Sequence, residues 1–313
     1  MRLAVLLIAV LGLGLWFTSN QMAKNIEAEF PPIGNFETVN GAQMHFVDAG
    51  VSGDTSKQAV IFIHGAGGNL RDLKHANGGR LEDQMRVIYV DRPGHGYSQS
   101  FDGSNDPKKQ AASVAGLMEK LQIPQAIIVG HSFGGAIAST FAVLHPEKTA
   151  GLVLIAQVSH PWSTGVAWYY DMSKIPGVDW LFANLLAAPI GSLMYPGAVE
   201  EVFSPDPAPA DFASGSGTKL LLRPDNFFEN AADINGLLDH VTEFHPRYKE
   251  ITAPTVIFHG DEDKSVNVEI HTINGMSKDI QGAEVKIYEN MGHMPTYIVP
   301  DDIAEAVRKM AGI

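Results

Sequence analysis

The sequence lacks several features that would place it in a functional class at once. None of its 313 residues is cysteine, which excludes disulfide bonds, thiolate zinc sites and a cysteine nucleophile. Charged residues make up only 18% of the chain and form no basic run, so nucleic acid is not an expected partner. No His-Glu-x-x-His or clustered His/Asp pattern indicates a metal. The net charge of −13 is ordinary for a protein surface in water.

The N-terminus carries a long uncharged apolar run. Arg2 precedes fifteen apolar residues, Leu3 to Phe17, a layout typical of a secretory signal. A bilayer core needs about 20 apolar residues as a helix, so this run of fifteen is short for a firm span. No clear small-residue cleavage site follows the run. We expect residues 1–20 to be an uncleaved signal anchor that associates with a membrane. The domain would then face the periplasm or the extracellular side. A cleaved signal peptide with a secreted domain, and an apolar helix docked on the domain, are the alternatives.

Apolar runs rich in β-branched residues alternate with helical patterns after the N-terminal segment. Asn40-Gly41 separates the first two runs and is a strong hairpin signal. The later runs are continuous, as in strands buried on both faces. The alternation predicts the α/β class, a mostly parallel eight-stranded sheet with helices on both faces and the hairpin at one edge. We expect strands at 36–41, 42–50, 58–65, 86–91, 126–130, 151–156, 254–260 and 283–289, and helices at 69–81, 106–121, 133–145 and 301–310.

One segment interrupts this alternation. Between about Gln157 and Pro254 no buried strand is evident, and the segment is too long for a loop. It predicts an inserted helical cap, with two further helices of the main layer as the alternative. Trp162, Trp168 and Tyr169 would line a substrate pocket or form the core of the cap itself. The expected division is an N-terminal segment at 1–20, a linker at 21–35, the core at 36–157 and 250–313, and the cap at 158–249.

A serine stands between glycines where one buried run ends and a helix begins. Gly130-His131-Ser132-Phe133-Gly134 fits G-x-S-x-G, a strained strand-to-helix turn that exposes the serine hydroxyl at the carboxyl edge of a sheet. The backbone N–H of Phe133 opens the helix and is placed to bind an oxyanion. The pattern alone is weak in a chain with 31 glycines, but a strand before it and a helix after it make it specific. We expect Ser132 to be a nucleophile.

A serine nucleophile needs a base, and that base needs an acid to orient it. His293 follows the last expected strand, and Asp261 and Asp263 follow the strand before it. In a parallel sheet these loops open on the same edge as Ser132. The order Ser, Asp, His and the serine turn resemble the α/β-hydrolase family, over the chain from about Phe30 onward. The resemblance places the acid three residues after the glycine that ends the strand. It therefore favours Asp263 over Asp261.

The same resemblance implies a second oxyanion donor. The family uses a His-Gly-x segment after the third strand, and here that segment is His64-Gly65-Ala66. The resemblance assigns the donor N–H to Ala66; a plain glycine-rich turn is the alternative. The stretch "GAGGN" lacks the Gly-Lys-Ser/Thr ending of a phosphate loop and the spacing of a dinucleotide fingerprint. No cofactor is expected.

Other polar residues at strand ends are expected to be structural. His131 comes off the tight turn beside Ser132, and His259 precedes the glycine of its own strand end. Asp91, Arg92 and His95 lie in a turn after the fourth strand, where short polar groups bond local backbone.

The expected reaction is acyl transfer to water through a Ser132-His293-Asp263 triad. Family members that open epoxides or displace halide carry an aspartate at the nucleophile position, so serine disfavours those activities. We expect a carboxylesterase or lipase-like hydrolase of small to medium apolar esters. A carbon–carbon bond hydrolase and a cofactor-free perhydrolase or haloperoxidase are alternatives within the fold, and a ligand-binding receptor-like module is the non-enzymatic one. The oligomeric state does not follow from the sequence.

Overall fold

The computed structural model describes residues 2–50, 58–165, 170, 174–175 and 177–313. Its centre is an eight-stranded sheet in the order β1-β2-β4-β3-β5-β6-β7-β8. β2 is antiparallel to both of its neighbours, β1 and β4. The remaining strands, β3 to β8, all run parallel to one another. The expected α/β class and the edge hairpin are confirmed. The strands are β1 Asn35–Val39, β2 Ala42–Gly50, β3 Ala59–Ile63, β4 Arg86–Val90, β5 Ala126–His131, β6 Thr149–Ile155, β7 Thr255–Gly260 and β8 Glu284–Tyr288.

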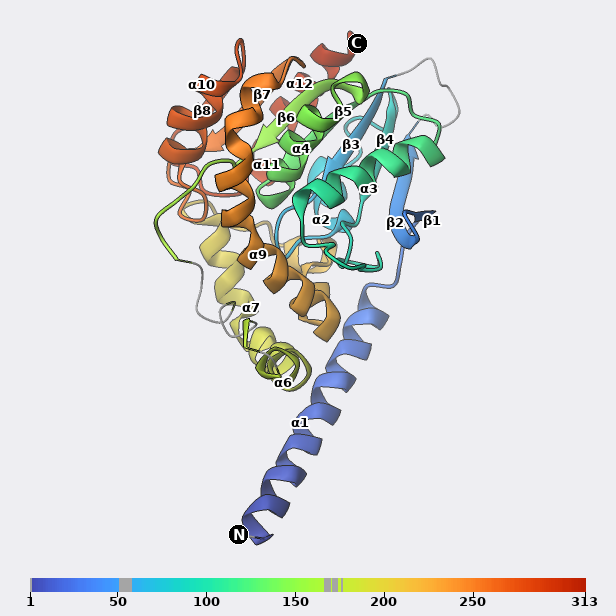
Figure 1. Ribbon diagram of the computed structural model, residues 1–313, viewed down its shortest axis with the longest axis vertical. Coiled ribbons are helices and arrows are strands. Elements are labelled where there is room, and N and C mark those ends of the chain that lie inside the picture. The colour runs from blue at the N-terminus through green and yellow to red at the C-terminus, as the bar shows by residue number, and fades with distance from the viewer. Residues whose placement is uncertain (1, 51–57, 166–169, 171–173, 176) are drawn as a thin grey trace.

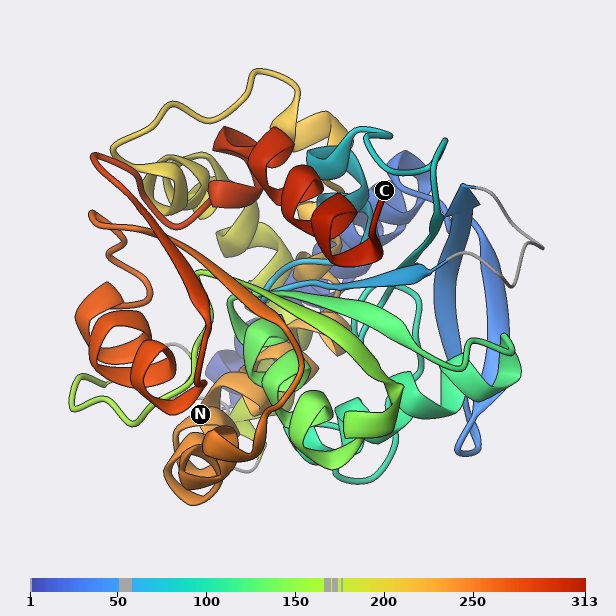
Figure 2. The same cartoon turned by 90° about the horizontal axis from the view of Figure 1, so that it is seen from above.

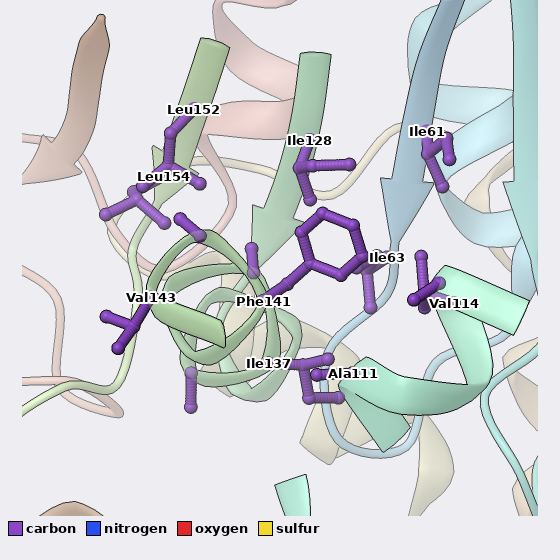
Figure 3. Close-up of a cluster of buried hydrophobic side chains, with 14 of the residues drawn as sticks. Ile61, Ile63, Ala111, Val114, Ile128, Ile137, Phe141, Val143, Leu152 and Leu154 are labelled. Atoms are coloured by element: carbon purple, nitrogen blue, oxygen red, sulfur yellow. The ribbon is translucent and has the colours of Figure 1, made fainter. Parts of the chain in front are cut away.

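Helices cover both faces of this sheet (Figure 2). On one face lie α3 Pro107–Lys120 and α4 Phe133–Leu144; on the other lie α2 Leu70–Asn77 and α12 Pro300–Ala311. Successive strand residues alternate between the two cores, because side chains of a strand point to opposite faces. Ile128 therefore packs with α4 residues such as Phe141 (Figure 3), whereas Ile127 and Val129 pack with α2 and α12.

Local sequence signals set the helix ends. Asn69 caps α2 by accepting from the N–H of Arg71, and Gly78 ends it in the left-handed conformation. The expected helix at 69–81 was therefore too long. Asp106 caps α3 in the same way, with Pro107 in the first turn. In the hairpin, Asn40 and Gly41 both have positive φ, 52° and 86°, as a type I′ turn requires.

The N-terminal helix is longer than expected. α1 runs from Arg2 to Glu29, so residues 21–29 are helical and not part of a linker. Its buried side chains recur at Ser19, Ala23, Ile26 and, just after the helix, Phe30. This spacing of four, three and four residues makes one contact stripe on a helix. The stripe packs against η3, α7 and η4, whereas the half of α1 before Ser19 extends away from the domain (Figure 1).

Helices fill most of the stretch between β6 and β7. They gather at the carboxyl end of the parallel strands, beside α1 (Figure 1). Within the described chain, Val178–Phe203 is a continuous helical stretch of 26 residues that is long and apolar enough, by length and composition alone, to cross a membrane. Its 18-residue apolar window has a mean hydropathy of 1.2, and 17% of that window is buried in the protein. The elements are α6 Val178–Leu181, η3 Phe182–Leu186, α7 Ala187–Phe203, α8 Phe212–Gly215, η4 Thr218–Leu222, α9 Pro224–Phe244 and η5 His245–Glu250.

Four short elements complete the fold, three of them in the C-terminal part. They connect β7 and β8 to each other and to α12, and one connects α4 to β6. These elements are η1 Pro146–Lys148, η6 Glu269–Met276, α10 Ser277–Asp279 and α11 Pro295–Ile298.

Candidate active site

Ser132 lies at the sharp turn between β5 and α4. Its φ of 53° and ψ of −118° are strained for a residue with a side chain. The turn forms because its neighbours are glycines: a Cβ on Gly134 would collide with the carbonyl oxygen of Ile63, and one on Gly130 with that of Gly134. The close approach of α4 to β3 and β5 holds the Ser132 hydroxyl at the sheet edge.

Three side chains from separate strand ends converge at this edge. The Oγ of Ser132 lies 3.0 Å from Nε2 of His293, and Nδ1 of His293 lies 2.7 Å from Oδ2 of Asp263. The three residues are only 6–8% exposed, so little water competes for these hydrogen bonds. Asp261, the other aspartate of that loop, is exposed. The structure therefore brings together Ser132, His293 and Asp263.

Asp263 is held as a carboxylate. Burial alone raises the pKa of its carboxyl, but the positive charge that His293 carries when protonated and hydrogen bonds from His259 and His293 outweigh burial and hold that pKa well below its usual range. Its second oxygen, Oδ1, accepts from the backbone N–H groups of Ser265 at 2.8 Å and Val266 at 2.9 Å. These four donors fix the orientation of the carboxylate toward the imidazole.

His259 is the contact that sequence reasoning missed. Its Nε2 faces two acceptors, Oδ2 of Asp263 at 3.2 Å and the carbonyl oxygen of Val266 at 2.9 Å. Its Nδ1 lies 2.7 Å from Oγ1 of Thr272, which in turn accepts from the amide of Gln157. The proton of His259 therefore belongs on Nε2, where Asp263 and the carbonyl oxygen of Val266 share it as acceptors. The only sequence signal was its position at a strand end, four residues before Asp263.

The loop after β3 lies beside Ser132. A Cβ at Gly65 would come within 3.0 Å of the Cβ of Ser132. The N–H of Gly67 donates to Oδ1 of Asn230 in α9 at 2.7 Å, and the N–H of Gly68 donates to the carbonyl of Gly65 at 3.3 Å. Ala66 is exposed toward the cavity described below. A helix of the β6–β7 insertion thus fastens this loop.

Arg92 connects the same loop to the start of α4. It is buried, donates to the carbonyl of Gly65 at 3.2 Å, and lies 4.5 Å from the centroid of the Phe133 ring. Its Nη1 lies 2.5 Å from Oδ2 of Asp233 in α9. Asp91, expected to be structural, accepts from the backbone N–H groups of Leu70 and Tyr97.

A cavity of about 200 Å³ opens in front of Ser132. Its polar lining includes Ser132, His293, His131 and Asp72, and the rest is mostly aliphatic. No lysine or arginine occurs among the described residues that line it. Burial lowers the pKa of His131 to about 3, with His293 nearby adding to the effect, so that ring is neutral. The aliphatic and aromatic lining comes from Ala198, Val199, Val202, Phe212, Leu221, Leu222 and Met294.

Asp72 is the carboxyl group of this cavity wall. Burial raises its pKa to about 6, although the hydroxyl of Tyr297 donates to its Oδ1 at 2.8 Å and partly offsets the effect. Near neutral pH this carboxyl can change its charge beside the substrate space.

The expected aromatic pocket residues do not line the part of this cavity that the structure describes. Trp162 packs against the hydrophobic core, with its ring 6.0 Å from that of His271. These contacts hold Trp162 against His271 of η6 and the core, outside the lining of the cavity in front of Ser132. Trp168 and Tyr169 lie outside the described residues.

Comparisons with known proteins agree with this architecture. The family model for the alpha/beta hydrolase fold matches residues 58–297. A 2-hydroxy-6-oxononadienedioate/2-hydroxy-6-oxononatrienedioate hydrolase from Paraburkholderia xenovorans (strain LB400) is 28% identical over 260 residues, 80% of this chain and 84% of the relative.

Two solved structures share the fold. A membrane phospholipase A, described as a bacterial virulence factor, has a TM-score of 0.70 at 21% identity and covers 98% of this chain and 96% of its own. An esterase from Exiguobacterium antarcticum has a TM-score of 0.72 at 18% identity and covers 90% and 100%. Together with the family match over residues 58–297, the sheet order and the serine turn lead to one conclusion: the chain belongs to the α/β-hydrolase fold family.

Proposed function

We propose that the protein is a serine hydrolase that cleaves carboxylic esters of apolar acids. The observation that carries the proposal is the chain of hydrogen bonds from Ser132 to His293 to Asp263, at the wall of a cavity whose lining is mostly aliphatic. A serine hydroxyl beside an imidazole that is oriented by a carboxylate is the arrangement that acyl transfer to water needs.

In the proposed mechanism Nε2 of His293 takes the proton of Ser132 as the hydroxyl attacks the ester carbonyl. The N–H of Phe133, at the first turn of α4, and the N–H of Ala66 bind the oxyanion. Of the three residues 66–68, Gly67 and Gly68 already donate within the protein, which leaves the Ala66 amide for this role. His293 then protonates the leaving alkoxide. A water that His293 deprotonates next releases the acid from the acyl-enzyme.

A carbon–carbon bond hydrolase is the second candidate, because the Paraburkholderia relative is named for such a substrate, a dioate. A dioate brings two carboxylates, which bind best to arginine or lysine. The described lining of the cavity offers neither, and it contains Asp72. Repulsion by Asp72 would weaken binding of an acidic substrate, so we place ester hydrolysis first.

We further propose that α1 anchors the protein in a membrane with the domain exported. The apolar side chains before Ser19 are largely exposed on the described protein, including Leu3 at 71% and Phe17 at 65%, and they need an apolar surrounding. Arg2 at the N-terminus favours the cytoplasmic side for that end.

The test uses the full chain in detergent. A fluorophosphonate probe should label the wild type rapidly and should not label Ser132→Ala. p-Nitrophenyl esters should be hydrolysed, with a vinylogous diketone acid measured in parallel. Absence of labelling would favour a ligand-binding module over an enzyme. Cleavage of the diketone acid with all esters inert would favour the carbon–carbon bond hydrolase.

A further inference from the structure

A second cavity, which we call the cap cavity, lies within the helices of the β6–β7 insertion. It measures about 160 Å³ and is bounded mainly by α7, η3, η4 and α9. Its described lining is almost entirely apolar, with tyrosine hydroxyls as the polar groups, and the Tyr195 hydroxyl is bonded to Oγ1 of Thr218 at 2.7 Å. Such a lining suits a hydrocarbon chain. The aliphatic and aromatic side chains include Phe182, Ile190, Met194, Leu221, Leu222 and Phe227.

The cap cavity adjoins the cavity in front of Ser132. The two cavities share four lining residues, Tyr195, Ala198, Leu221 and Leu222. A single layer of side chains therefore lies between them. An ester with its carbonyl at Ser132 would direct one aliphatic arm toward this shared wall.

The cap cavity also borders an apolar part of the protein surface. Ile190 and Met194 line the cavity and are also 40% and 54% exposed. Leu193, between them, is 84% exposed, and Trp180 and Leu181 of α6 are about half exposed. Clusters of exposed apolar side chains mark contact with a partner or a membrane. We call this set, with Ile190 and Met194, the α6–α7 face.

The N-terminal helix indicates that this partner is a bilayer. α1 packs against η3 and α7, and its contact stripe begins at Ser19, two residues after the apolar run ends at Phe17. Fifteen residues of helix span roughly 22 Å, about 8 Å less than the hydrocarbon core of a bilayer. A bilayer centred on this run would extend further along α1, toward the level of α6 and α7 (Figure 1).

We propose that the cap cavity is a binding site for the aliphatic chain of a membrane lipid ester, whose chain enters from the bilayer across the α6–α7 face and whose carbonyl reaches Ser132. This inference rests on the proposed ester hydrolase function and narrows its substrate to long-chain acyl esters presented at a lipid surface. The reaction itself is the ester hydrolysis through Ser132 described above, with water as the acyl acceptor.

Two glycines of α7 provide a matched test of the cavity. A side chain at Gly191 would enter the cap cavity and collide with the end of Leu222, whereas a Cβ at Gly197 meets no atom within 4 Å. With the full chain in detergent, Gly191→Val should lower kcat/KM for p-nitrophenyl dodecanoate by about tenfold or more, the loss expected from displacing a few methylenes. Butyrate hydrolysis should fall by a clearly smaller factor, because only the displaced Leu222 connects this change to the cavity in front of Ser132, and Gly197→Val should behave as wild type for both esters.

The outcomes separate this inference from the proposed function. Equal effects on dodecanoate and butyrate, or no effect of Gly191→Val on either, would overturn the tail site while leaving ester hydrolysis in place. Failure of every ester, with Ser132 unlabelled by a fluorophosphonate, would overturn the function itself.

The entry route has its own test with vesicles. The probe is a fluorogenic dodecanoyl ester lipid in phosphatidylcholine vesicles, with the full chain reconstituted into them. Leu193→Asp, which charges the α6–α7 face, should slow hydrolysis of the vesicle-borne ester several-fold and leave p-nitrophenyl dodecanoate in detergent unchanged. Ile313→Asp is the control, because Ile313 is an exposed apolar residue (59%) at the C-terminus, on the opposite end of the molecule (Figure 1). Equal vesicle rates for Leu193→Asp, Ile313→Asp and the wild type would overturn entry across the α6–α7 face.

Discussion

The substitution Asp263→Asn should lower kcat strongly, because it places the proton of His293 on Nε2 instead of Nδ1. Oδ1 of Asp263 accepts from two backbone N–H groups, and Oδ2 accepts from His293 and His259. An asparagine can match only one of these two sides. If its amide oxygen takes the backbone N–H groups, its NH₂ faces Nδ1 of His293. His293 must then carry its proton on Nε2 and can no longer accept the proton of Ser132.

The opposite rotation of the amide is costly. It would point the NH₂ at two buried backbone donors, each of which would lose its acceptor at a cost of about 1–3 kcal/mol. The first orientation should therefore dominate. The equivalent tautomer error in a serine triad lowers kcat about 10⁴-fold, which corresponds to roughly 5.4 kcal/mol in the activation barrier. KM should change little, because Asp263 is not among the described residues that line the cavity.

The assay compares kcat of Asp263→Asn with that of Asp261→Asn on p-nitrophenyl butyrate. Asp261 is exposed in the same loop, so its exchange controls for changes in loop charge and should leave kcat nearly unchanged. Circular dichroism would check that both variants fold. If Asp263→Asn kept more than about a tenth of wild-type kcat, the tautomer argument would be wrong.

Three further predictions follow from other parts of the site. Ala66→Pro, which removes one N–H, should lower kcat by about 10²–10³-fold while Ala66→Gly does not; similar kcat values for the two would exclude this amide as an oxyanion donor. Burial raises the pKa of Asp72 to about 6, so the folded protein holds that proton more tightly than the unfolded chain does, and this group costs stability as the pH rises from about 4 to 6, by up to about 3 kcal/mol. Asp72→Asn should remove that decline in urea unfolding measurements, and parallel curves for variant and wild type would contradict it. Asp233→Ala should lower the free energy of unfolding by about 3–5 kcal/mol, because it leaves the buried Arg92 without a counter-charge; a loss below about 1 kcal/mol would mean that water or another group compensates.

The strands, and the meeting of Ser132 with His293, could be predicted from the patterns of the sequence itself, whereas the choice of Asp263 over Asp261 rested on the resemblance to the α/β-hydrolase family. A short continuous apolar run rich in β-branched residues, such as that of β5, is typical of a strand buried on both faces. Once the strands are parallel, the residues that follow them share an edge, so Ser132 and His293 can be placed together without coordinates.

The residues that support the site could not be predicted in the same way. Asn230 and Asp233 lie in a helix nearly a hundred residues after Ser132, and nothing in that helix indicates that it contacts the loop after β3. The sequence does not distinguish His259 from any other histidine at a strand end, because its contact with Thr272 depends on how η6 packs. The helix beyond residue 20 did leave a signal, the recurring small and apolar residues Ser19, Ala23 and Ile26, but polar neighbours obscured it.

The packing of the N-terminal helix on η4 has a consequence for anyone who prepares a soluble form of this protein. Ile26 and Phe30 support Leu220 and Leu222, and Leu222 belongs to the walls of both cavities. Deleting the first thirty residues would therefore remove side chains that support the wall of both cavities, as well as the exposed apolar half of α1. The substrate selectivity measured on such a truncated protein would be that of altered cavities. Because α1 supports the cavity wall, changes in α1 during evolution would also change the range of substrates.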